Sequence, residues 1–186
     1  MNKKVLLCDI DEVLWEMMPT WCETYNKLST TNQIVTPQMM TSWHISDIIG
    51  EDEAQNFYSI LNQDSFWDEV VRNQDLLYTR NTYSRLVLLM QKYDLYIVTA
   101  TDYTKSHKLD LFLNLYDCIN KDQLILLSDK WLLDADIIID DKAETLQKFA
   151  EKGTRCVKIY HPWNAWYECE SYPHFIIAAN RLLEEV

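Results

Sequence analysis

Residues 3–15 read KKVLLCDIDEVLW, an apolar run followed by acids. Its apolar run, from Val5 to Cys8, has the length of a buried strand and continues directly into Asp9 and Asp11. Carboxylates are rare inside buried segments unless they are paired or bind a metal. The stretch therefore predicts a strand over residues 3–8 that ends at a functional site.

The composition indicates an ordinary globular domain. The chain has 186 residues, of which 48% are hydrophobic and 25% are charged. No stretch approaches the roughly 20 apolar residues of a membrane span, and the apolar run after Lys3 and Lys4 is too short for a signal peptide. The five cysteines are odd in number and form no CxxC pair, which favours reduced thiols. We therefore expect a cytoplasmic protein without a membrane partner.

The net charge of −12 argues against a polynucleotide partner. Proteins that bind such polymers displace counterions with a basic stripe, and this chain has no Lys/Arg cluster beyond Lys3 and Lys4. A small phosphorylated substrate is compatible with the charge if a cation and a few lysines neutralise it locally. The oligomeric state is left open by the sequence, a homodimer included.

Further apolar runs alternate with helical patterns along the chain. Strands are expected at 94–98, 124–127, 136–139 and 156–160. Apolar residues keep helical spacing within 80–92, and a helix over 142–151 ends near Gly153, a C-cap. This alternation predicts an α/β fold, with a parallel sheet covered by helices on both faces.

A long interval interrupts that alternation between the first strand and the helix at 80–92. It has about 65 residues, too many for a crossover loop, and it is rich in aromatic residues. We expect residues 16–78 to form a small helical cap over the sheet edge, inserted into a core of 1–15 and 79–186. Most of the aromatic side chains are expected to form the core of the cap itself.

Polar residues follow several of the predicted strands. Asp9 and Asp11 follow the first, Thr99 ends the second, and Asp140-Asp141 end the run DADIIID. In open α/β sheets, ligands bind at the carboxyl ends of the strands, which Lys108 and Lys130 could also reach from the connections. Converging carboxylates repel one another unless a cation lies among them, and oxygen ligands open to substrate suit Mg²⁺. The sequence therefore predicts a magnesium and phosphate site.

In this order the motifs resemble those of the haloacid dehalogenase superfamily of phosphotransferases. DIDEV at 9–13 is similar to its DxDx(T/V) motif, IVTA at 97–100 contains the strand-end Thr, a lysine follows, and IIIDD at 137–141 supplies the terminal acids. The resemblance spans about 9 to 141. It implies a Rossmann-type three-layer fold with a small helical cap inserted after strand 1.

A closer likeness is to the 5′(3′)-deoxyribonucleotidases. Lys130 closes the triplet Ser128-Asp129-Lys130 ten residues before Asp140, as in that family, and Lys108 opens a similar helix. Lys105 is a rival for the role of Lys108, which we prefer. HPWNAW at 161–166 is similar to the family's Pro-aromatic-Asn segment after the last strand.

The cap carries part of this likeness. Its segments SWHIS and SFWDE resemble the aromatic segments that hold the base in the family, which implies a base site containing Met17, Trp43, Phe66 and Trp67. Glu12 departs from the family because many members carry Gly there. Met17 stands where a base-stacking Phe is usual, which leaves the base preference open.

The resemblance implies Mg²⁺-dependent hydrolysis of 5′(3′)-deoxyribonucleoside monophosphates through an aspartyl-phosphate. Asp9 would be the nucleophile, and Asp11 would protonate the leaving alkoxide and then activate water. The phosphate oxygens would be held by Thr99, Lys108 and Lys130.

The same resemblance implies a ligand set for the metal. Mg²⁺ would be bound by the Asp9 carboxylate, the Asp11 backbone carbonyl and Asp140. Asp141 would lie behind the direct ligands or bind the ion through water.

Three alternatives stay open at this point. The substrate could be a sugar phosphate or another small phosphoester. A catalytically dead phosphate-binding homologue would keep the fold without turnover. A phosphoacceptor signalling domain also combines acids, Thr and Lys, but its paired acids end the first strand, whereas here they end a later one.

Overall fold

A six-stranded sheet forms the centre of the computed structural model, which describes residues 3–31, 33–100 and 105–185. The strand order is β3-β2-β1-β4-β5-β6, and all neighbouring strands are parallel. The strands are β1 (Lys4–Cys8), β2 (Tyr93–Thr99), β3 (Leu124–Leu126), β4 (Ile137–Asp140), β5 (Arg155–Ile159) and β6 (Glu170–Tyr172). The parallel α/β sheet expected from the sequence is confirmed.

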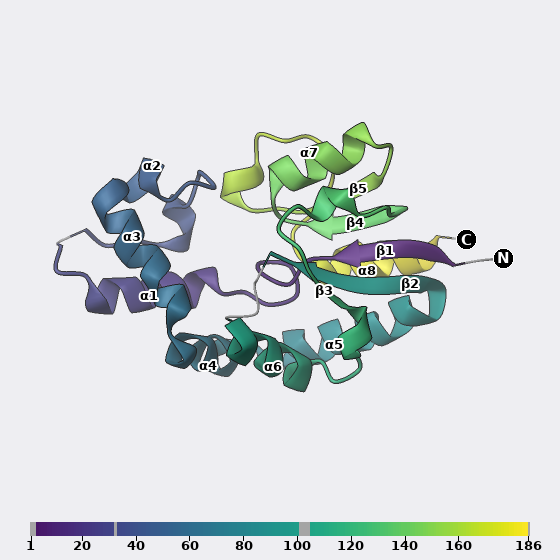
Figure 1. Cartoon of the computed structure of the whole chain (residues 1–186), viewed down its shortest axis with the longest axis horizontal. Coiled ribbons are helices and arrows are strands. Elements are labelled where there is room, and N and C mark those ends of the chain that lie inside the picture. The colour runs from purple at the N-terminus through teal and green to yellow at the C-terminus, as the bar shows by residue number, and fades with distance from the viewer. Residues whose placement is uncertain (1–2, 32, 101–104, 186) are drawn as a thin grey trace.

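Helices cover both faces of this sheet (Figure 1). On one face lies α7 (Ala143–Glu151), and on the other lie α5 (Leu76–Lys92), α6 (Ser106–Leu115) and α8 (Phe175–Glu184). Adjacent residues of β1 point to opposite faces, so Leu7 packs in the cluster that contains Phe149 of α7, whereas Leu6 packs in the cluster that contains Ala178 of α8. Burial of the central strands on both faces explains their continuous apolar runs.

The structure contains two elements that were not expected from the sequence. The edge strand β6 has three residues, two of them polar, and is too short to give a hydrophobic pattern. The helix α8 has a readable pattern, because its buried residues Phe175, Ala178, Ala179 and Leu182 keep i, i+3, i+4, i+7 spacing. The helix α5 begins at Leu76, four residues earlier than expected, because Asp75 caps it by accepting the Tyr78 N–H at 2.6 Å.

Four helices between β1 and α5 lie beyond the carboxyl ends of the strands (Figure 1). They are α1 (Met18–Leu28), α2 (Ser46–Ile49), α3 (Glu51–Ser59) and α4 (Asp64–Asn73). Among the described residues, no helix combines the length and the apolar character that a bilayer crossing requires. The division into a cap of 16–78 and a core of 1–15 and 79–186 stays a prediction.

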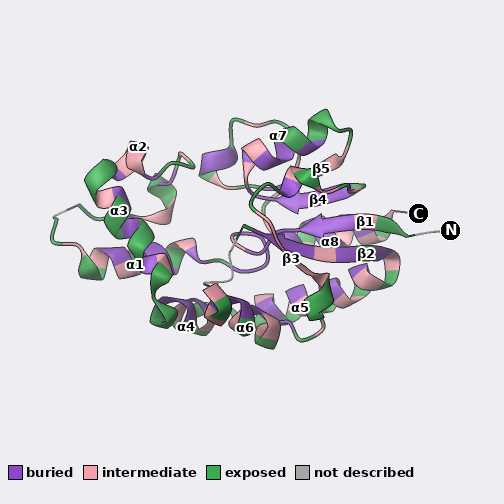
Figure 2. Ribbon diagram, viewed as in Figure 1, coloured by how far each residue is buried: buried purple, intermediate pink, exposed green. Residues whose placement is uncertain are grey.

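Aromatic packing joins this helical region to the sheet. Trp67 of α4 stacks on Trp15 with ring centroids 6.0 Å apart, and Trp15 meets Phe112 of α6 edge to face at 5.8 Å. The buried residues of α1, α3 and α4, purple in Figure 2, belong to the same hydrophobic cluster as one face of the sheet. The aromatic residues of 16–78 therefore extend the main core and do not form a separate one.

The carboxyl end of α7 shows why a glycine is required there. Gly153 has φ +83°, its N–H donates to the Ala150 carbonyl at 2.9 Å, and the Thr154 N–H donates to the Phe149 carbonyl at 3.1 Å. These two bonds form a Schellman motif, whose left-handed residue is normally glycine. The predicted helix end is confirmed.

Gly153→Ala is expected to lower the free energy of unfolding by about 1 kcal/mol, because an L side chain strains a backbone in this conformation. A Cβ at this position meets no atom within 4 Å, so packing does not contribute. Gly153→Asn is the matched control and should lose less, since Asn tolerates the left-handed region. Urea unfolding followed by circular dichroism measures both variants. An Ala variant as stable as the wild type would contradict the strain argument.

Candidate active site

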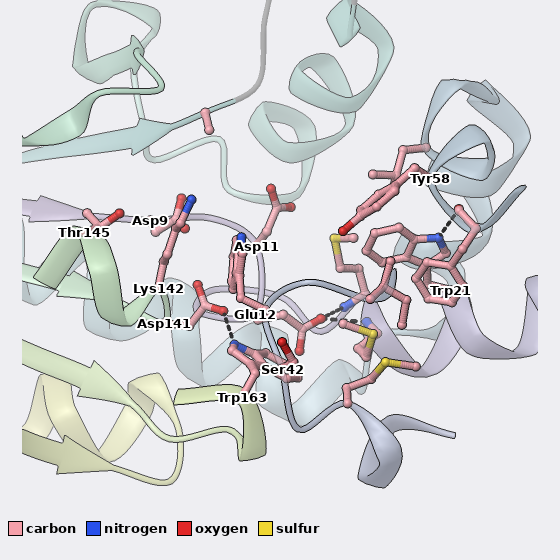
Figure 3. A pocket seen from close by; sticks show the side chains of 18 of the residues that line it. Asp9, Asp11, Glu12, Trp21, Ser42, Tyr58, Asp141, Lys142, Thr145 and Trp163 are labelled. Carbon is pink, nitrogen blue, oxygen red and sulfur yellow. Dashed lines mark hydrogen bonds between the residues drawn. The ribbon is translucent and has the colours of Figure 1, made fainter. Parts of the chain in front are cut away.

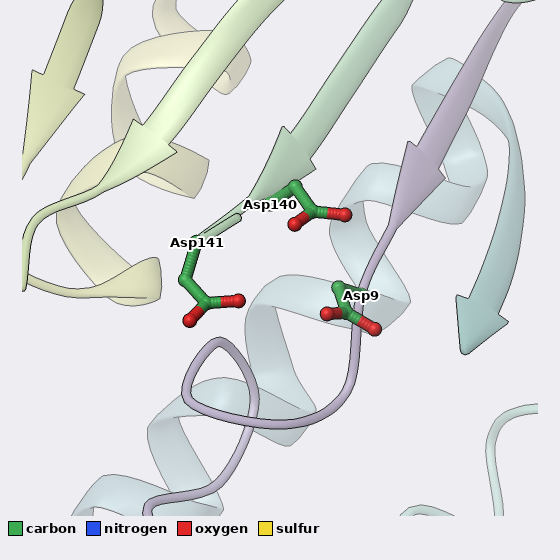
Figure 4. Close-up of side chains that lie close together, drawn as sticks. All are labelled: Asp9, Asp140 and Asp141. Carbon is green, nitrogen blue, oxygen red and sulfur yellow. The ribbon is translucent and has the colours of Figure 1, made fainter. Parts of the chain in front are cut away.

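The carboxyl ends of β1 and β4 bring three aspartates together (Figure 4). The register pairs Cys8 with Ile139, and the Asp9 N–H continues the ladder by donating to the Ile139 carbonyl at 3.0 Å. One carboxylate oxygen from each of Asp9, Asp140 and Asp141 lies within 4.8 Å of the others, and all three side chains are buried. The parallel register thus brings together acids that are far apart in the sequence.

Lys130 lies buried among these acids. Its Nζ is 2.8 Å from Asp9 Oδ1 and 2.7 Å from Asp140 Oδ2. Burial opposes the charge of the lysine, but Asp140 and Asp9 outweigh burial and raise the pKa of Lys130. Burial, partly offset by Lys130, raises the pKa of Asp9 to about 7, and burial together with Asp140 and Asp9 raises the pKa of Asp141. The positive charge of Lys130 alone therefore does not neutralise the cluster.

The cluster fits a divalent cation. Asp9 Oδ1 is buried without a well-aligned hydrogen-bond donor, since Lys130 meets it as an ion pair only. Carboxylate oxygens that border a cavity are ligands that Mg²⁺ accepts together with water and phosphate oxygens. A cation would also favour the ionised acids, because a nearby opposite charge lowers a carboxyl pKa. Asp9, Asp140 and Asp141 could therefore hold a metal ion.

Asp11 is not among these clustered side chains and lies on the loop after β1. Lys108 donates to Asp11 Oδ2 at 2.5 Å, and the Trp15 indole N–H donates to Oδ1 at 2.9 Å. Lys105 instead donates to the Leu61 carbonyl at 2.9 Å. The structure thus places Lys108 beside the second acid, and Trp15, which sequence reasoning missed, fixes the orientation of that carboxylate.

Thr99, at the end of β2, and Lys130, in the connection between β3 and β4, lie at the same edge of the sheet. Thr99 is the last residue of β2 and is buried, and its carbonyl accepts the Leu127 N–H at 2.9 Å. The following residue, Ala100, lines the same cavity as Lys130. Contact between Thr99 and a phosphate stays a prediction.

Residues of the segment 161–166 hold Asp141 in place through hydrogen bonds. The Trp163 indole N–H donates to Asp141 Oδ2 at 3.0 Å, and the Asn164 amide donates to the Asp141 carbonyl at 2.7 Å. His161 stacks on Trp163 with a centroid distance of 4.3 Å and contacts the Glu12 carbonyl through Nε2 at 2.8 Å. In the sequence, only the family likeness points to this segment. Its hydrogen bonds to Asp141 are seen only in the structure.

A cavity of about 260 Å³ connects the acids to the helical region (Figure 3). At one end its wall includes Asp9, Asp11, Lys130 and Asp141. At the other end the wall is apolar and aromatic, and it is formed by Met17, Met18, Trp21, Met40, Phe57 and Tyr58. The arrangement lets a charged group meet the acids while an apolar or flat group lies against the opposite wall.

The four residues predicted for the base site separate into two pairs. Met17 and Trp43 line the cavity, and Trp43 is 39% exposed with the Lys142 Nζ 4.9 Å from its ring centroid. Phe66 and Trp67 are buried against each other, with centroids 4.9 Å apart, and are not part of the cavity wall. Both face the main core, and Trp67 also lies under the Lys108 ammonium at 4.7 Å. Direct contact with a base therefore does not fit Phe66 and Trp67 in this arrangement.

Comparison with known families matches most of the chain. The family described as 5′ nucleotidase, deoxy (Pyrimidine), cytosolic type C protein matches residues 3–174. A 5′(3′)-deoxyribonucleotidase of Clostridium acetobutylicum is 26% identical over 190 positions, which cover 95% of this chain and 100% of the relative. One from Bacillus subtilis is 27% identical over 150 residues, which cover 79% of this chain and 81% of the relative.

Solved structures share the fold at low sequence identity. A putative haloacid dehalogenase-like hydrolase from Burkholderia xenovorans superposes with a TM-score of 0.59 and 10% identity, covering 100% of both chains. A hydrolase from Pseudomonas syringae gives a TM-score of 0.59 with 8% identity, covering 97% of this chain and 98% of the other. A putative HAD-hydrolase from Bacillus subtilis bound to magnesium gives 0.53 with 14% identity, covering 98% and 99%. The haloacid dehalogenase-like fold expected from the motifs is confirmed.

Trp163→Phe is expected to weaken Mg²⁺ binding about tenfold, because the variant loses the hydrogen bond that orients Asp141 but keeps a ring against His161. Calorimetric titration of Mg²⁺ into protein freed of metal by EDTA and dialysis measures the affinity. Trp166→Phe, at an exposed position, is the control and should bind as the wild type does. Unchanged affinity in Trp163→Phe would show that Asp141 does not depend on the indole.

Proposed function

The chain belongs to the 5′ nucleotidase, deoxy (pyrimidine), cytosolic type C family and is a phosphoric monoester hydrolase; from this premise we propose that it dephosphorylates 5′(3′)-deoxyribonucleoside monophosphates. The observation that carries the proposal is the cavity, which has acids and a lysine at one end and aromatic side chains at the other. A nucleotide has the matching polarity, with a phosphate at one end and a flat base at the other.

The first half of the proposed reaction transfers the phosphoryl group to the enzyme. A carboxylate oxygen of Asp9 attacks the phosphorus, the P–O ester bond breaks, and Asp11 gives its proton to the departing alkoxide. In the second half, Asp11 takes a proton from water as that water attacks the phosphorus. The acyl phosphate bond then breaks, which frees Asp9 and inorganic phosphate.

The lysines supply positive charge at both acids. Lys130 already lies within ion-pair distance of Asp9, so it is suited to hold an oxygen of a phosphate bound there. Lys108 Nζ lies 2.5 Å from Asp11 Oδ2. We propose that an entering phosphate draws Lys108 toward its own oxygens, while Asp11 transfers the proton to the leaving group. Thr99 would add a hydroxyl to the same phosphate site.

Mg²⁺ is the proposed cofactor. The Asp9 and Asp140 carboxylates and the Asp11 backbone carbonyl would hold it, with Asp141 acting directly or through water. When bound, the ion neutralises phosphate charge and helps to align the phosphorus with Asp9. Lys142 fixes Asp140, since its backbone N–H donates to Asp140 Oδ1 at 2.8 Å.

The apolar wall favours a nucleotide over a sugar phosphate. A sugar phosphate would turn several hydroxyls toward the thioethers of Met17, Met18 and Met40, where they would lose hydrogen bonds to water. A pyrimidine ring buries flat apolar faces there at no such cost. The net charge of −12 supports a small substrate over a nucleic-acid polymer.

The cellular setting is part of the proposal. None of the five cysteines, all of which lie in described segments, forms a disulfide, and this supports a reducing cytoplasm. A homodimer stays a prediction that gel filtration with light scattering can test.

The proposed function is tested by a screen of dUMP, dTMP, the matching ribonucleotides and sugar phosphates with Mg²⁺. Deoxynucleotides should be hydrolysed fastest. Asp9→Asn should fold as the wild type does but keep at most a few per cent of its activity, because the change is isosteric and removes only the attacking charge. Released phosphate is the readout, and circular dichroism checks the fold. Substantial turnover by the Asn variant would reject Asp9 as nucleophile, and preference for sugar phosphates would reject the nucleotide proposal.

Trp43→Ala is expected to raise the Michaelis constant for dUMP roughly tenfold, since stacking on a base contributes about 1–3 kcal/mol. Trp43→Phe, which keeps a ring at the same place, should lose less. Hydrolysis of p-nitrophenyl phosphate, whose leaving group is small and activated, should barely change in either variant. Equal loss on both substrates would assign Trp43 to support of the cap, and no loss on either would remove it from the site.

A further inference from the structure

Glu12 holds an unusual backbone position next to the reacting acids. Its φ of +57° lies in the left-handed region, and it is the one non-glycine residue there among those the structure describes. Glutamate has no intrinsic preference for this conformation, and glycine adopts it freely. Contacts of Glu12 with its surroundings must therefore hold the residue in place.

The side chain of Glu12 makes two of those contacts through a single oxygen. Oε1 accepts the backbone N–H of Met17 at 2.7 Å and that of Met18 at 2.6 Å, at the start of α1. The backbone carbonyl of Glu12 lies 2.8 Å from His161 Nε2. None of the hydrogen bonds made by described residues involves Oε2.

This second oxygen borders the cavity. Glu12 is 8% exposed and is part of the cavity wall. In Figure 3 its carboxyl group lies between Asp11 on one side and the aromatic side chain of Trp21 on the other. A carboxyl oxygen on a cavity wall that makes no hydrogen bond within the protein is suited to a polar group of a ligand.

We propose that Glu12 determines substrate specificity by binding a hydroxyl group of the leaving alcohol close to the ester oxygen. The inference rests on the proposed function, and it deepens it by naming the part of the nucleotide that is recognised. In a deoxyribonucleoside 5′-monophosphate the group is the 3′-hydroxyl, and in a 3′-monophosphate it is the 5′-hydroxyl. Each of these lies on the sugar, between the phosphate and the base.

A hydroxyl is the partner that fits the carboxyl group best. It can donate a hydrogen bond to a carboxylate oxygen, and it can accept one from a protonated carboxyl, so it satisfies Glu12 in either state. Met17, Met18 and Trp21 beyond Glu12 offer apolar surface to the rest of the substrate. Among the described residues of the cavity wall, Glu12 has the only carboxyl group that neither clusters with Asp9 nor pairs with Lys108. The sugar hydroxyl would bind to this group.

The experiment compares two substrates that differ in this hydroxyl alone. The specificity constant kcat/KM is measured with Mg²⁺ for dUMP and for 2′,3′-dideoxyuridine 5′-monophosphate. The wild type should prefer dUMP by roughly tenfold or more, the effect of one hydrogen bond to a buried carboxyl group. In Glu12→Gly, whose glycine adopts the backbone without strain, the preference should fall to within about twofold. A ratio of substrates cancels any general loss of activity caused by the missing cap of α1.

Glu12→Gln is the matched variant. Its amide can still accept from Met17 and Met18 and can bond a hydroxyl, so it should restore most of the preference that Glu12→Gly loses. A wild-type ratio near one overturns the inference without any variant. A Gly variant that keeps the wild-type ratio, or a Gln variant that behaves as the Gly variant does, assigns Glu12 to support of the cap and overturns it also.

The outcome is separable from that of the proposed function. If nucleotides are hydrolysed and the ratio is near one, only the inference about Glu12 fails. If no nucleotide is hydrolysed but p-nitrophenyl phosphate is, the proposed substrate fails. Glycerol 1-phosphate and propyl phosphate then form the substrate pair, and preference for the hydroxylated ester that depends on Glu12 would support the inference on its own.

Discussion

Crowding of negative charge at one end of a parallel sheet is the constraint on which this molecule depends. The register of β1 and β4 brings Asp9, Asp140 and Asp141 within 4.8 Å, in a place where burial raises the pKa values of Asp9 and Asp141. Lys130 compensates part of the charge. The remaining excess of negative charge destabilises the unliganded site, and a cation that entered together with a phosphate would offset it. The rigid sheet is what keeps the acids from moving apart.

The helical region is attached to this charged end through shared side chains. Trp15 follows the loop of the two acids, stacks on Trp67, and also donates to Asp11. Glu12 caps the start of α1 from the same loop. A movement of the helical region would therefore disturb the second acid. In the proposed reaction, substrate selection by Glu12 and proton transfer by Asp11 would therefore be coupled, because both residues belong to one short loop.

The sequence predicts what depends on the backbone pattern, and it fails where side-chain direction decides. The convergence of Asp9, Asp140 and Asp141 can be expected from the sequence, because parallel strands share one carboxyl edge. Phe66 and Trp67 belong to an aromatic segment, and nothing in residue type separates a ring that faces the core from one that faces a cavity. The bond from Trp163 to Asp141 spans 22 residues and needs the final fold to be seen. In the sequence, Glu12 stands out only because many members of the resembled family carry glycine at this position.

The two ends of the cavity differ in rigidity, and this difference bears on how selective the protein can be. The acidic end is built from strand termini and hydrogen-bonded acids, which fix its geometry. The far end contains Met17, Met18 and Met40, whose flexible thioethers adapt to the shape of what they contact. If the proposed nucleotide binds here, such a wall would discriminate weakly between pyrimidine bases. Strong discrimination must then come from polar groups with fixed positions, since a hydrogen-bonding site rejects an analogue that lacks the partner. On the cavity wall, Glu12 meets that condition, because its side chain accepts two backbone N–H bonds and its backbone carbonyl contacts the His161 ring.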